Sequence, residues 1–403
     1  MKRKDTCIYL DYAATTPLDA RVFSAMQPYL TIHFGNPGSV HVFGQEALAA
    51  IDKSREIIAR CLQVEFNEII FTGSATEANN LAIQGVLEYW MQYKRKSNNI
   101  VPRIITTELE HDSVREVCRG LEKKGVEIVY LPLHDNGTVK LEALSEALND
   151  RTILVSVMYA NNEIGVIEPV QKVSEIVQRF RNSKSDGIYP LLHTDAVQAL
   201  QFLDCKPHEL GVDLMTLSSH KIYGPKGVGA LYAKNQNNNE KNIAPIIYGG
   251  GQEWGMRSGT ENTSLIVGFA HAFALLEELK QQETIRITEL RDYFLKRLQK
   301  VFGKSVVLNG SLQNRIPNNL NIAFLNHDAT DLIVALDING VAASYGSACS
   351  SRAWKPSPVL NALGLQLKYI RSSIRFSLGR MTKRSDINRT ITILKKITSH
   401  VRK

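Results

Sequence analysis

Short apolar runs alternate with amphipathic stretches through the first two thirds of this 403-residue chain. The apolar runs are bounded by turn-forming residues, as buried strands are, and cover residues 68–71, 103–107, 127–131, 152–158, 189–192 and 212–217. Helical periodicity covers residues 19–30, 40–61, 78–90, 141–149 and 170–181. This alternation predicts a mainly parallel sheet with helices on both faces.

The last third of the chain has a different pattern, which predicts a second unit. A long amphipathic helix is expected over residues 264–302, followed by shorter elements at residues 319–324, 331–336 and 342–347. A chain of this length exceeds one usual hydrophobic core, so we expect about two domains. We predict a large α/β domain over residues 16–262 and a smaller α+β domain from residues 1–15 and 263–403.

Two of the predicted strands end in polar clusters. Residues 189–192 lead into a cluster that contains Asp195, and residues 212–217 lead into Ser218-Ser219-His220-Lys221. Ligands of open α/β sheets bind where strands end. Pyridoxal phosphate needs a lysine for its Schiff base and an acid for its ring nitrogen, so the pair Asp195 and Lys221 suits this cofactor. Taken singly, each is more simply a capping aspartate or a surface lysine.

A third cluster has the character of a phosphate site. Residues 72–77 place small residues directly before the predicted helix 78–90. Free backbone N–H groups and the positive end of the helix dipole point the same way there, which favours an anion at Ala75 and Thr76. The simpler interpretation is an N-cap made by Ser74 or Thr76. In the next strand-to-helix connection, Asp112 or Ser113 is expected to cap a helix, and a lone histidine such as His111 is usually structural.

The charge and the cysteine content of the chain limit the classes of function that it can have. The net charge is +8, but the basic residues are spread through helical patterns, so a solvated surface is expected rather than direct binding of nucleic acid. Five cysteines without CxxC spacing argue against a disulfide framework and against a zinc site. No apolar run approaches the length of a membrane span, and the basic start lacks the apolar region of a signal peptide. We therefore expect a cytoplasmic protein.

A family resemblance rests on several of these motifs. They are Leu10-Asp11-Tyr12-Ala13-Ala14-Thr15-Thr16-Pro17, Asp195-Ala196-Val197-Gln198, Ser218-Ser219-His220-Lys221-Ile222-Tyr223-Gly224-Pro225-Lys226-Gly227, Ser347-Ala348-Cys349-Ser350-Ser351 and Ser373-Ile374-Arg375-Phe376-Ser377-Leu378-Gly379-Arg380. The chain resembles the cysteine desulfurases, class V aminotransferase-type pyridoxal phosphate enzymes of fold type I. The segment around Cys349 is similar to the first, long-loop group of that family. The resemblance implies an enzyme that converts L-cysteine to L-alanine.

The resemblance also implies roles for individual residues. Lys221 would hold pyridoxal phosphate and move the substrate's α-proton, and Asp195 would face the ring nitrogen. His111 would lie over the ring and assist proton transfer. Asn162 and Gln198 would adjoin the phenolic oxygen. The phosphate would be held by Ala75, Thr76, Ser218, His220 and, from the neighbouring chain of a homodimer, Thr260. Arg375 would bind the substrate carboxylate with Asn162, and Cys349 would carry the sulfur as a persulfide to iron–sulfur scaffold proteins or tRNA-thiolation acceptors.

Several alternatives remain open at this point. A selenocysteine lyase or another aminotransferase-like enzyme could use the same scaffold, since fold does not determine reaction. A protein of another class, an inactive scaffold that binds assembly partners, is the other rival. Transient binding of an iron–sulfur cluster through Cys349 is the one metal chemistry left open.

Two positions depart from the family pattern. Gly73-Ser74 has the reverse of the usual order, and Trp254 stands where many relatives have arginine.

Overall fold

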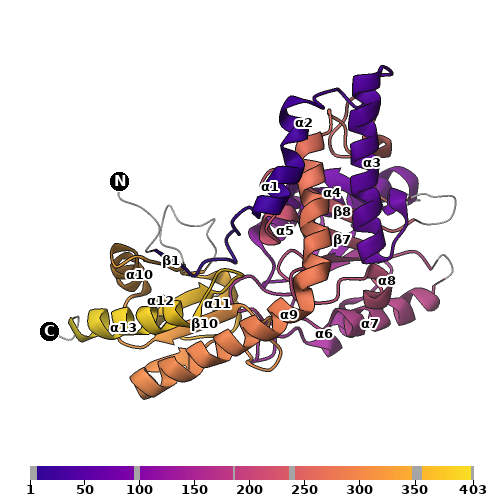
Figure 1. Ribbon diagram of the computed structural model, residues 1–403. Coiled ribbons are helices and arrows are strands. Elements are labelled where there is room, and N and C mark those ends of the chain that lie inside the picture. The colour runs from indigo at the N-terminus through magenta and orange to yellow at the C-terminus, as the bar shows by residue number, and fades with distance from the viewer. Residues whose placement is uncertain (1–6, 95–99, 185–186, 236–240, 347–355, 401–403) are drawn as a thin grey trace.

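The computed structural model describes residues 7–94, 100–184, 187–235, 241–346 and 356–400. Cys349 lies outside these residues. The described chain forms a larger unit around a seven-stranded sheet and a smaller unit around a three-stranded and a two-stranded sheet (Figure 1). The mainly parallel α/β architecture predicted from the hydrophobic pattern is confirmed.

The seven-stranded sheet has the order β2-β8-β7-β6-β5-β3-β4. Its strands are β2 (Ile69–Thr72), β3 (Arg103–Thr107), β4 (Glu127–Leu131), β5 (Thr152–Ser156), β6 (Leu191–Asp195), β7 (Leu214–Ser218) and β8 (Gly229–Ala233). Strands β3 to β7 pair in parallel, while β8 runs antiparallel to both β2 and β7. The carboxyl ends of the parallel strands therefore share one edge of the sheet.

Helices cover both faces of this sheet because adjacent strand residues are apolar and point in opposite directions. On β6, Leu191 packs with α4 (Ala75–Tyr89) and α5 (Asp112–Glu122). Leu192 packs instead in the cluster that contains residues of α3 (Val42–Leu62), α7 (Val170–Asn182) and α9 (Thr263–Phe302). The shorter α6 (Leu141–Ala147) and α8 (Pro207–Leu210) complete the larger unit.

The smaller unit is built from the end of the chain and a short N-terminal strand. Strands β12 (Ser373–Ser377), β10 (Asn319–Phe324) and β9 (Val306–Leu308) form an antiparallel sheet, and β1 (Ile8–Tyr9) pairs with β11 (Val341–Ala342). Its helices are α10 (Ala329–Ile338), α11 (Pro358–Ala362), α12 (Leu367–Arg371) and α13 (Arg384–His400). Helix α9 runs beside α3 and continues along this unit (Figure 1). The domain division at residue 262 stays a prediction.

Several elements differ from the sequence-based expectation. The helix expected over residues 19–30 is divided into α1 (Ala20–Met26) and α2 (Pro28–Thr31), because Pro28 lacks the N–H that a continuous helix would use. Of the element expected at residues 342–347, the described residues 342–346 contain only the end of the short strand β11 (Val341–Ala342). Strand β8 was not predicted, because glycine-rich turn sequence leads directly into it.

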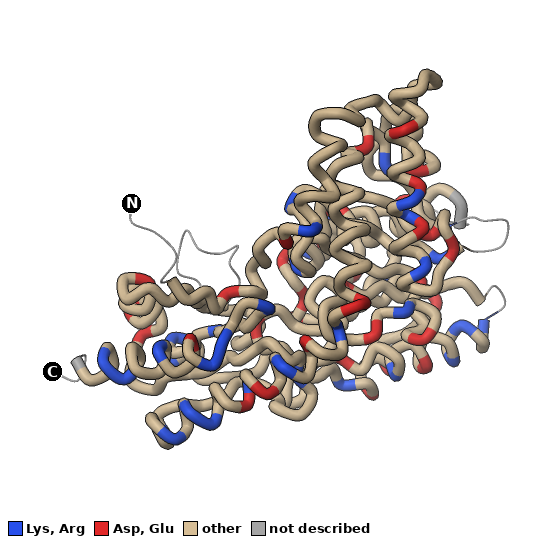
Figure 2. The backbone as a smooth tube through the Cα atoms, in the orientation of Figure 1, with Lys and Arg blue, Asp and Glu red and all other residues tan. Residues whose placement is uncertain are grey.

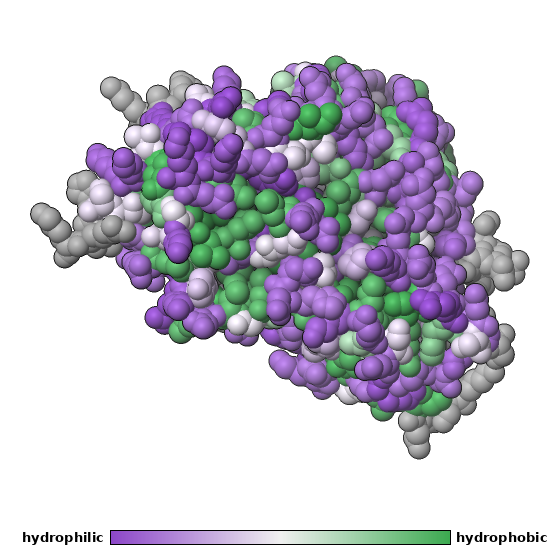
Figure 3. Space-filling view, turned by 90° about the horizontal axis from the view of Figure 1, so that it is seen from below, coloured by the Kyte–Doolittle hydropathy of each residue, from purple (hydrophilic) through white to green (hydrophobic). Residues whose placement is uncertain are grey.

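Charged and apolar groups are both widely distributed over the molecule. Lys and Arg positions are interspersed with Asp and Glu positions along most elements (Figure 2). Seen from below, apolar groups form patches between hydrophilic regions (Figure 3). Among the described residues, no helix is long and apolar enough to cross a membrane, and no cluster of three or more His, Cys, Asp or Glu could hold a metal ion.

Candidate active site

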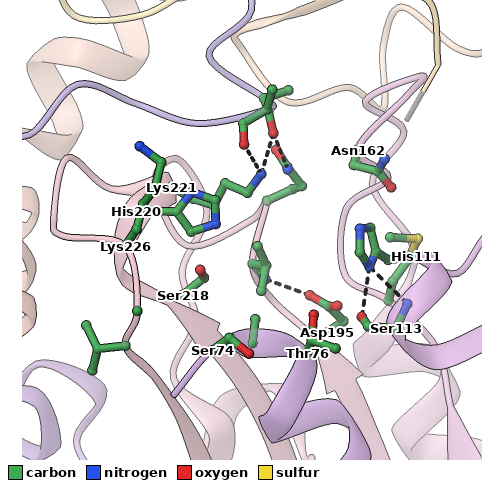
Figure 4. A pocket seen from close by; sticks show the side chains of 18 of the residues that line it. Ser74, Thr76, His111, Ser113, Asn162, Asp195, Ser218, His220, Lys221 and Lys226 are labelled. Atoms are coloured by element: carbon green, nitrogen blue, oxygen red, sulfur yellow. Dashed lines mark hydrogen bonds between the residues drawn. The ribbon is translucent and has the colours of Figure 1, made fainter. Parts of the chain in front are cut away.

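A cavity of about 290 Å³ opens at the carboxyl edge of the seven-stranded sheet. Asp195 is the last residue of β6, Ser218 is the last of β7, and Lys221 ends the single turn that follows, η3 (Ser219–Lys221). Figure 4 shows Lys221 and His220 entering from one side, with Asn162 and His111 on the other. Strand ends that are far apart in sequence thus converge on one volume, as the alternation of strands and helices predicted.

Most of the predicted site residues line this cavity. They are Ala75, Thr76, His111, Asn162, Asp195, Gln198, Ser218, His220, Lys221 and Arg375. Thr260 does not line it and is exposed in the single chain, and Cys349 is outside the described residues. Lining residues that were not predicted as site residues include Ala13, Ser113, Met158 and Lys226. The structure brings the residues together, and their individual roles remain predictions.

The Lys221 amine is held against the N-terminal segment. Its Nζ donates to the carbonyl oxygens of Ala13 at 2.6 Å and Ala14 at 2.7 Å. Gln198 Nε2 donates to the same Ala13 oxygen at 3.1 Å. Burial, and then the charges of Lys221 and Lys226, lowers the pKa of His220 to about 4. His220 is therefore neutral near pH 7 and adds no charge beside the two lysines.

Asp195 is buried and held by two hydrogen bonds. Oδ2 accepts from Asn79 Nδ2 at 2.9 Å, and Oδ1 accepts from the Val197 N–H at 3.0 Å. The Asn79 amide also donates to Ser113 Oγ at 2.8 Å. Asn79 was missed in the sequence, although it lies four residues after Ala75, on the same face of α4. These contacts fix the orientation of the carboxylate at the cavity wall.

Helix α4 presents its N-terminus to the cavity. Ser74 is extended (φ −172°), and its Oγ accepts from the Glu77 N–H at 3.1 Å, so the N-cap interpretation is correct. The amides of the first two helical residues, Ala75 and Thr76, have no acceptor within the helix and remain available to an anion. Because Gly73 does not adopt a positive φ, the reversed Gly73-Ser74 order needs no left-handed residue here.

Close approach of this helix to the sheet depends on Gly229 in β8. A Cβ at Gly229 would lie 2.8 Å from the backbone carbon of Ser74 and 2.9 Å from the Ala75 nitrogen. Any side chain at this position would clash with the backbone at the start of α4 and push it away from β8. The anion-binding end of α4 therefore depends on a glycine in β8, the strand next to β2 in the sheet order.

The cap of α5 differs from the prediction. His111, and not Asp112 or Ser113, is the N-cap residue, because its extended backbone lets Nδ1 accept from the Ser113 N–H at 3.1 Å. The Asp112 carboxylate instead pairs with Arg115 within the helix. Capping fixes one ring nitrogen of His111 while the ring lines the cavity.

Asn162 and Arg375 form the wall nearest the smaller unit. Arg375 Nη1 donates to the Asn162 carbonyl oxygen at 2.9 Å, and Nη2 donates to Asp11 Oδ1 at 2.8 Å. Arg375 is 1% exposed. Among the described residues, Arg375 Nε and Asn162 Oδ1 are buried without a hydrogen-bond partner. A polar ligand could satisfy these atoms, since buried polar groups are normally paired.

The glycine-rich loop after residue 249 is fixed by a buried ion pair. Arg55 binds the Glu253 carboxylate with both Nη atoms, at 2.7 and 2.6 Å. Trp254 adopts a positive φ of 55° and covers the Arg55 guanidinium, with 4.5 Å from Cζ to the ring centroid. Further along the loop, Arg257 Nε binds Glu77 of α4 at 2.7 Å. The tryptophan at this departure from the family pattern thus has a packing role.

Comparison with known proteins defines the family. The aminotransferase class-V family model matches residues 8–390, and the chain belongs to this family, whose members depend on pyridoxal phosphate. Relatives named cysteine desulfurase IscS include that of Dictyoglomus turgidum, 45% identical over 402 residues (100% of this chain and 96% of that protein), and that of Ehrlichia chaffeensis, 44% identical over 381 residues (94% and 88%).

Solved structures of similar proteins have the same fold as this chain. A NifS-like protein, 33% identical, has a TM-score of 0.88 and an alignment that covers 98% of this chain and all of that one. SspA, solved in complex with cysteine, is also 33% identical, with a TM-score of 0.77 and coverage of 92% and 98%. The fold type expected from the resemblance is confirmed over nearly the whole chain.

Proposed function

We propose that this chain is a pyridoxal phosphate-dependent cysteine desulfurase that converts L-cysteine to L-alanine and holds the sulfur as a persulfide on Cys349. The observation that carries the proposal is the convergence of Lys221, Asp195, the start of α4 and Arg375 on one cavity. Each supplies a different chemical group or site. These are, in the same order, an amine, a buried carboxylate, an anion site and a guanidinium that can bind a carboxylate.

The residues present fit pyridoxal phosphate. Lys221 offers the amine, Asp195 offers a buried carboxylate for the ring nitrogen, and the amides of Ala75 and Thr76 with Ser218 and His220 offer phosphate contacts. Asn162 Oδ1 has no hydrogen-bond partner among the described residues, as expected for an atom that accepts a hydrogen bond from a bound ligand. When bound, the group supplies an electron sink for the substrate's Cα.

The chain's own groups then provide proton and sulfur transfer. Arg375 and Asn162 would orient the substrate, the Lys221 amine would accept the α-proton, and His111, which lines the cavity, would assist proton transfer. The Cys349 thiolate attacks the substrate Sγ, so a sulfur–sulfur bond forms while the Cβ–Sγ bond breaks. The electron pair of the broken bond goes to Cβ, which takes a proton and becomes the methyl group of alanine. One cysteine and one enzyme thiol thus give one alanine and one persulfide, with no external oxidant.

A homodimer with shared sites is part of the proposal. Thr260 is exposed in the single chain, as expected for a residue that reaches the phosphate of a neighbouring chain. Large apolar side chains are also exposed around α2 and the start of α3, among them Phe34 (70%), Val40 (93%) and Val42 (62%). Exposed apolar groups gathered in this way are typical of an interface. The persulfide would pass to thiols of iron–sulfur scaffold or tRNA-thiolation proteins.

The experiment that tests the proposed function uses the purified, cofactor-loaded chain. We expect alanine and Cys349-bound persulfide to form in equal amounts in a single turnover with L-cysteine, and the protein to sediment as a dimer of the 45.1 kDa chain. A keto acid as the main product would instead favour an aminotransferase. Turnover of selenocysteine but not cysteine would favour a selenocysteine lyase, and a protein with no cofactor absorbance would favour an inactive scaffold.

Arg375→Lys is expected to weaken cysteine binding. Lysine keeps the positive charge but loses the planar fork that binds a carboxylate with two hydrogen bonds. We expect KM for L-cysteine to rise about tenfold, which corresponds to ~1.4 kcal/mol, with a smaller change in kcat. Initial rates of alanine formation measure both constants. An unchanged KM in a variant that keeps its cofactor absorbance would remove Arg375 from substrate binding.

A further inference from the structure

Glu163 is a buried carboxylate that the proposed reaction does not use. It follows Asn162 in the chain and is 2% exposed. Its Oε2 accepts a hydrogen bond from Ser357 Oγ at 2.5 Å. A Cβ at Gly346 would lie 3.2 Å from the same oxygen, and Gly346 has a positive φ of 69° that favours glycine. Ser357, which follows the stretch that contains Cys349, is therefore bonded to this carboxylate oxygen, and Gly346, which precedes that stretch, lies close to it.

The backbone of Glu163 is anchored on both units. Its N–H donates to Asn161 Oδ1 at 2.8 Å, within the turn after β5. Its carbonyl oxygen accepts from Asn319 Nδ2 and Asn321 Nδ2 of β10, each at 3.1 Å. The three asparagines leave this residue little freedom to move. The carboxylate is thus a fixed point and not a flexible surface group.

The same point adjoins the predicted substrate site. The Arg375 backbone pairs with Ser344, with its N–H 2.6 Å from the Ser344 oxygen and the Ser344 N–H 3.2 Å from the Arg375 oxygen. The Arg375 side chain binds the Asn162 carbonyl oxygen next to Glu163. One end of the stretch that carries Cys349 and the predicted substrate arginine therefore share a short antiparallel contact.

We propose that Glu163 is a positioning residue that holds Ser357, which follows the stretch carrying Cys349, close to Gly346, which precedes it, at the substrate end of the cavity. The inference rests on the proposed function and names a further residue for it. Keeping Ser357 close to Gly346 holds the chain on either side of Cys349 near Arg375, which favours reaction of the Cys349 thiol at the substrate site. Burial raises the pKa of Glu163, while the Ser357 hydrogen bond and the Arg375 charge oppose that rise.

The test separates the Glu163 contact from a second role of Ser357. Ser357 Oγ also accepts from the Leu360 N–H at 3.1 Å and so caps α11. Asp and Asn are both good N-cap residues and have the same shape, but only Asn can donate to Glu163. Ser357→Asp therefore keeps the cap and sets a carboxylate against Glu163, whereas Ser357→Asn is its matched control.

Two readouts are expected to change together. In the protein without cofactor, amide hydrogen exchange of peptides that cover residues 341–346 and 356–360 should be about tenfold faster in Ser357→Asp than in Ser357→Asn. In the loaded protein, the single-turnover rate of persulfide formation on Cys349 should fall about tenfold in Ser357→Asp, with the affinity for L-cysteine changed less than about twofold. Adding Glu163→Gln to Ser357→Asp should restore both, because the glutamine amide donates to the new carboxylate.

A second buried carboxylate provides the control for a merely structural effect. Glu168, 1% exposed, lies five residues further along and accepts from the Val139 N–H at 2.9 Å. Glu168→Gln should leave both readouts unchanged. Equal exchange in Ser357→Asp and Ser357→Asn, or no restoration by Glu163→Gln, would overturn the proposal. Failure of the proposed function would be recognised separately, because the unmodified protein would then form no persulfide on Cys349. The comparison of hydrogen exchange between Ser357→Asp and Ser357→Asn would still test the Glu163 contact.

Discussion

Replacing Lys221 with alanine is expected to abolish the visible absorbance of bound cofactor and to lower alanine formation by about 10³-fold or more. Lys221 is the proposed covalent anchor of the cofactor and the proposed base for the α-proton, so one substitution removes both functions. The amine also donates to the carbonyl oxygens of Ala13 and Ala14, at 2.6 and 2.7 Å, which places it at the cavity wall.

Lys226 is the matched comparison for Lys221. It lines the same cavity from the same connection between β7 and β8, but it is exposed, whereas Lys221 is half-buried. Absorption spectra of both alanine variants after incubation with pyridoxal phosphate measure the difference, with circular dichroism to confirm folding. We expect Lys226→Ala to keep the absorbance. Loss of absorbance in Lys226→Ala and its retention in Lys221→Ala would reverse the assignment.

The sequence predicts the central sheet and its chemistry for a simple physical reason. Buried parallel strands are short apolar runs, and the carboxyl ends of neighbouring parallel strands meet at one edge. The ends of β6 and β7 therefore had to bring Asp195 and Lys221 near each other. The start of α4 was predictable in the same way, because small residues between a strand and a helix identify an anion site.

Contacts between distant segments could not be predicted from local pattern. Asn79 bonds to Asp195, 116 residues away in the chain, and Ser357 bonds to Glu163 over a separation of 194 residues. Neither position has a local signal beyond its place on a helix or a turn. The His111 cap was missed because Asp and Ser are the commoner capping residues, and the choice depended on which side chain faced the helix start.

Cys349→Ser is expected to keep cofactor binding and cysteine binding while lowering alanine formation by about 10³-fold. Serine preserves the size of the side chain, but its hydroxyl is a far weaker nucleophile toward sulfur than a thiolate. Absorbance changes on addition of L-cysteine report binding, and alanine reports completion of the reaction. The pair of measurements separates loss of the sulfur acceptor from loss of the substrate site.

Three of the four other cysteines make poor substitutes, because Cys118 and Cys205 are buried and Cys61 is partly buried. Burial raises the pKa of Cys118 and of Cys205 to about 12 and also raises that of Cys61, and the thiolate is the form that attacks sulfur. Among the described cysteines, Cys7 is the exposed one, so Cys7→Ser is the matched control and should retain full turnover. If Cys349→Ser formed alanine normally while Cys7→Ser did not, the persulfide would belong to Cys7, and Cys349 would have no part in the reaction.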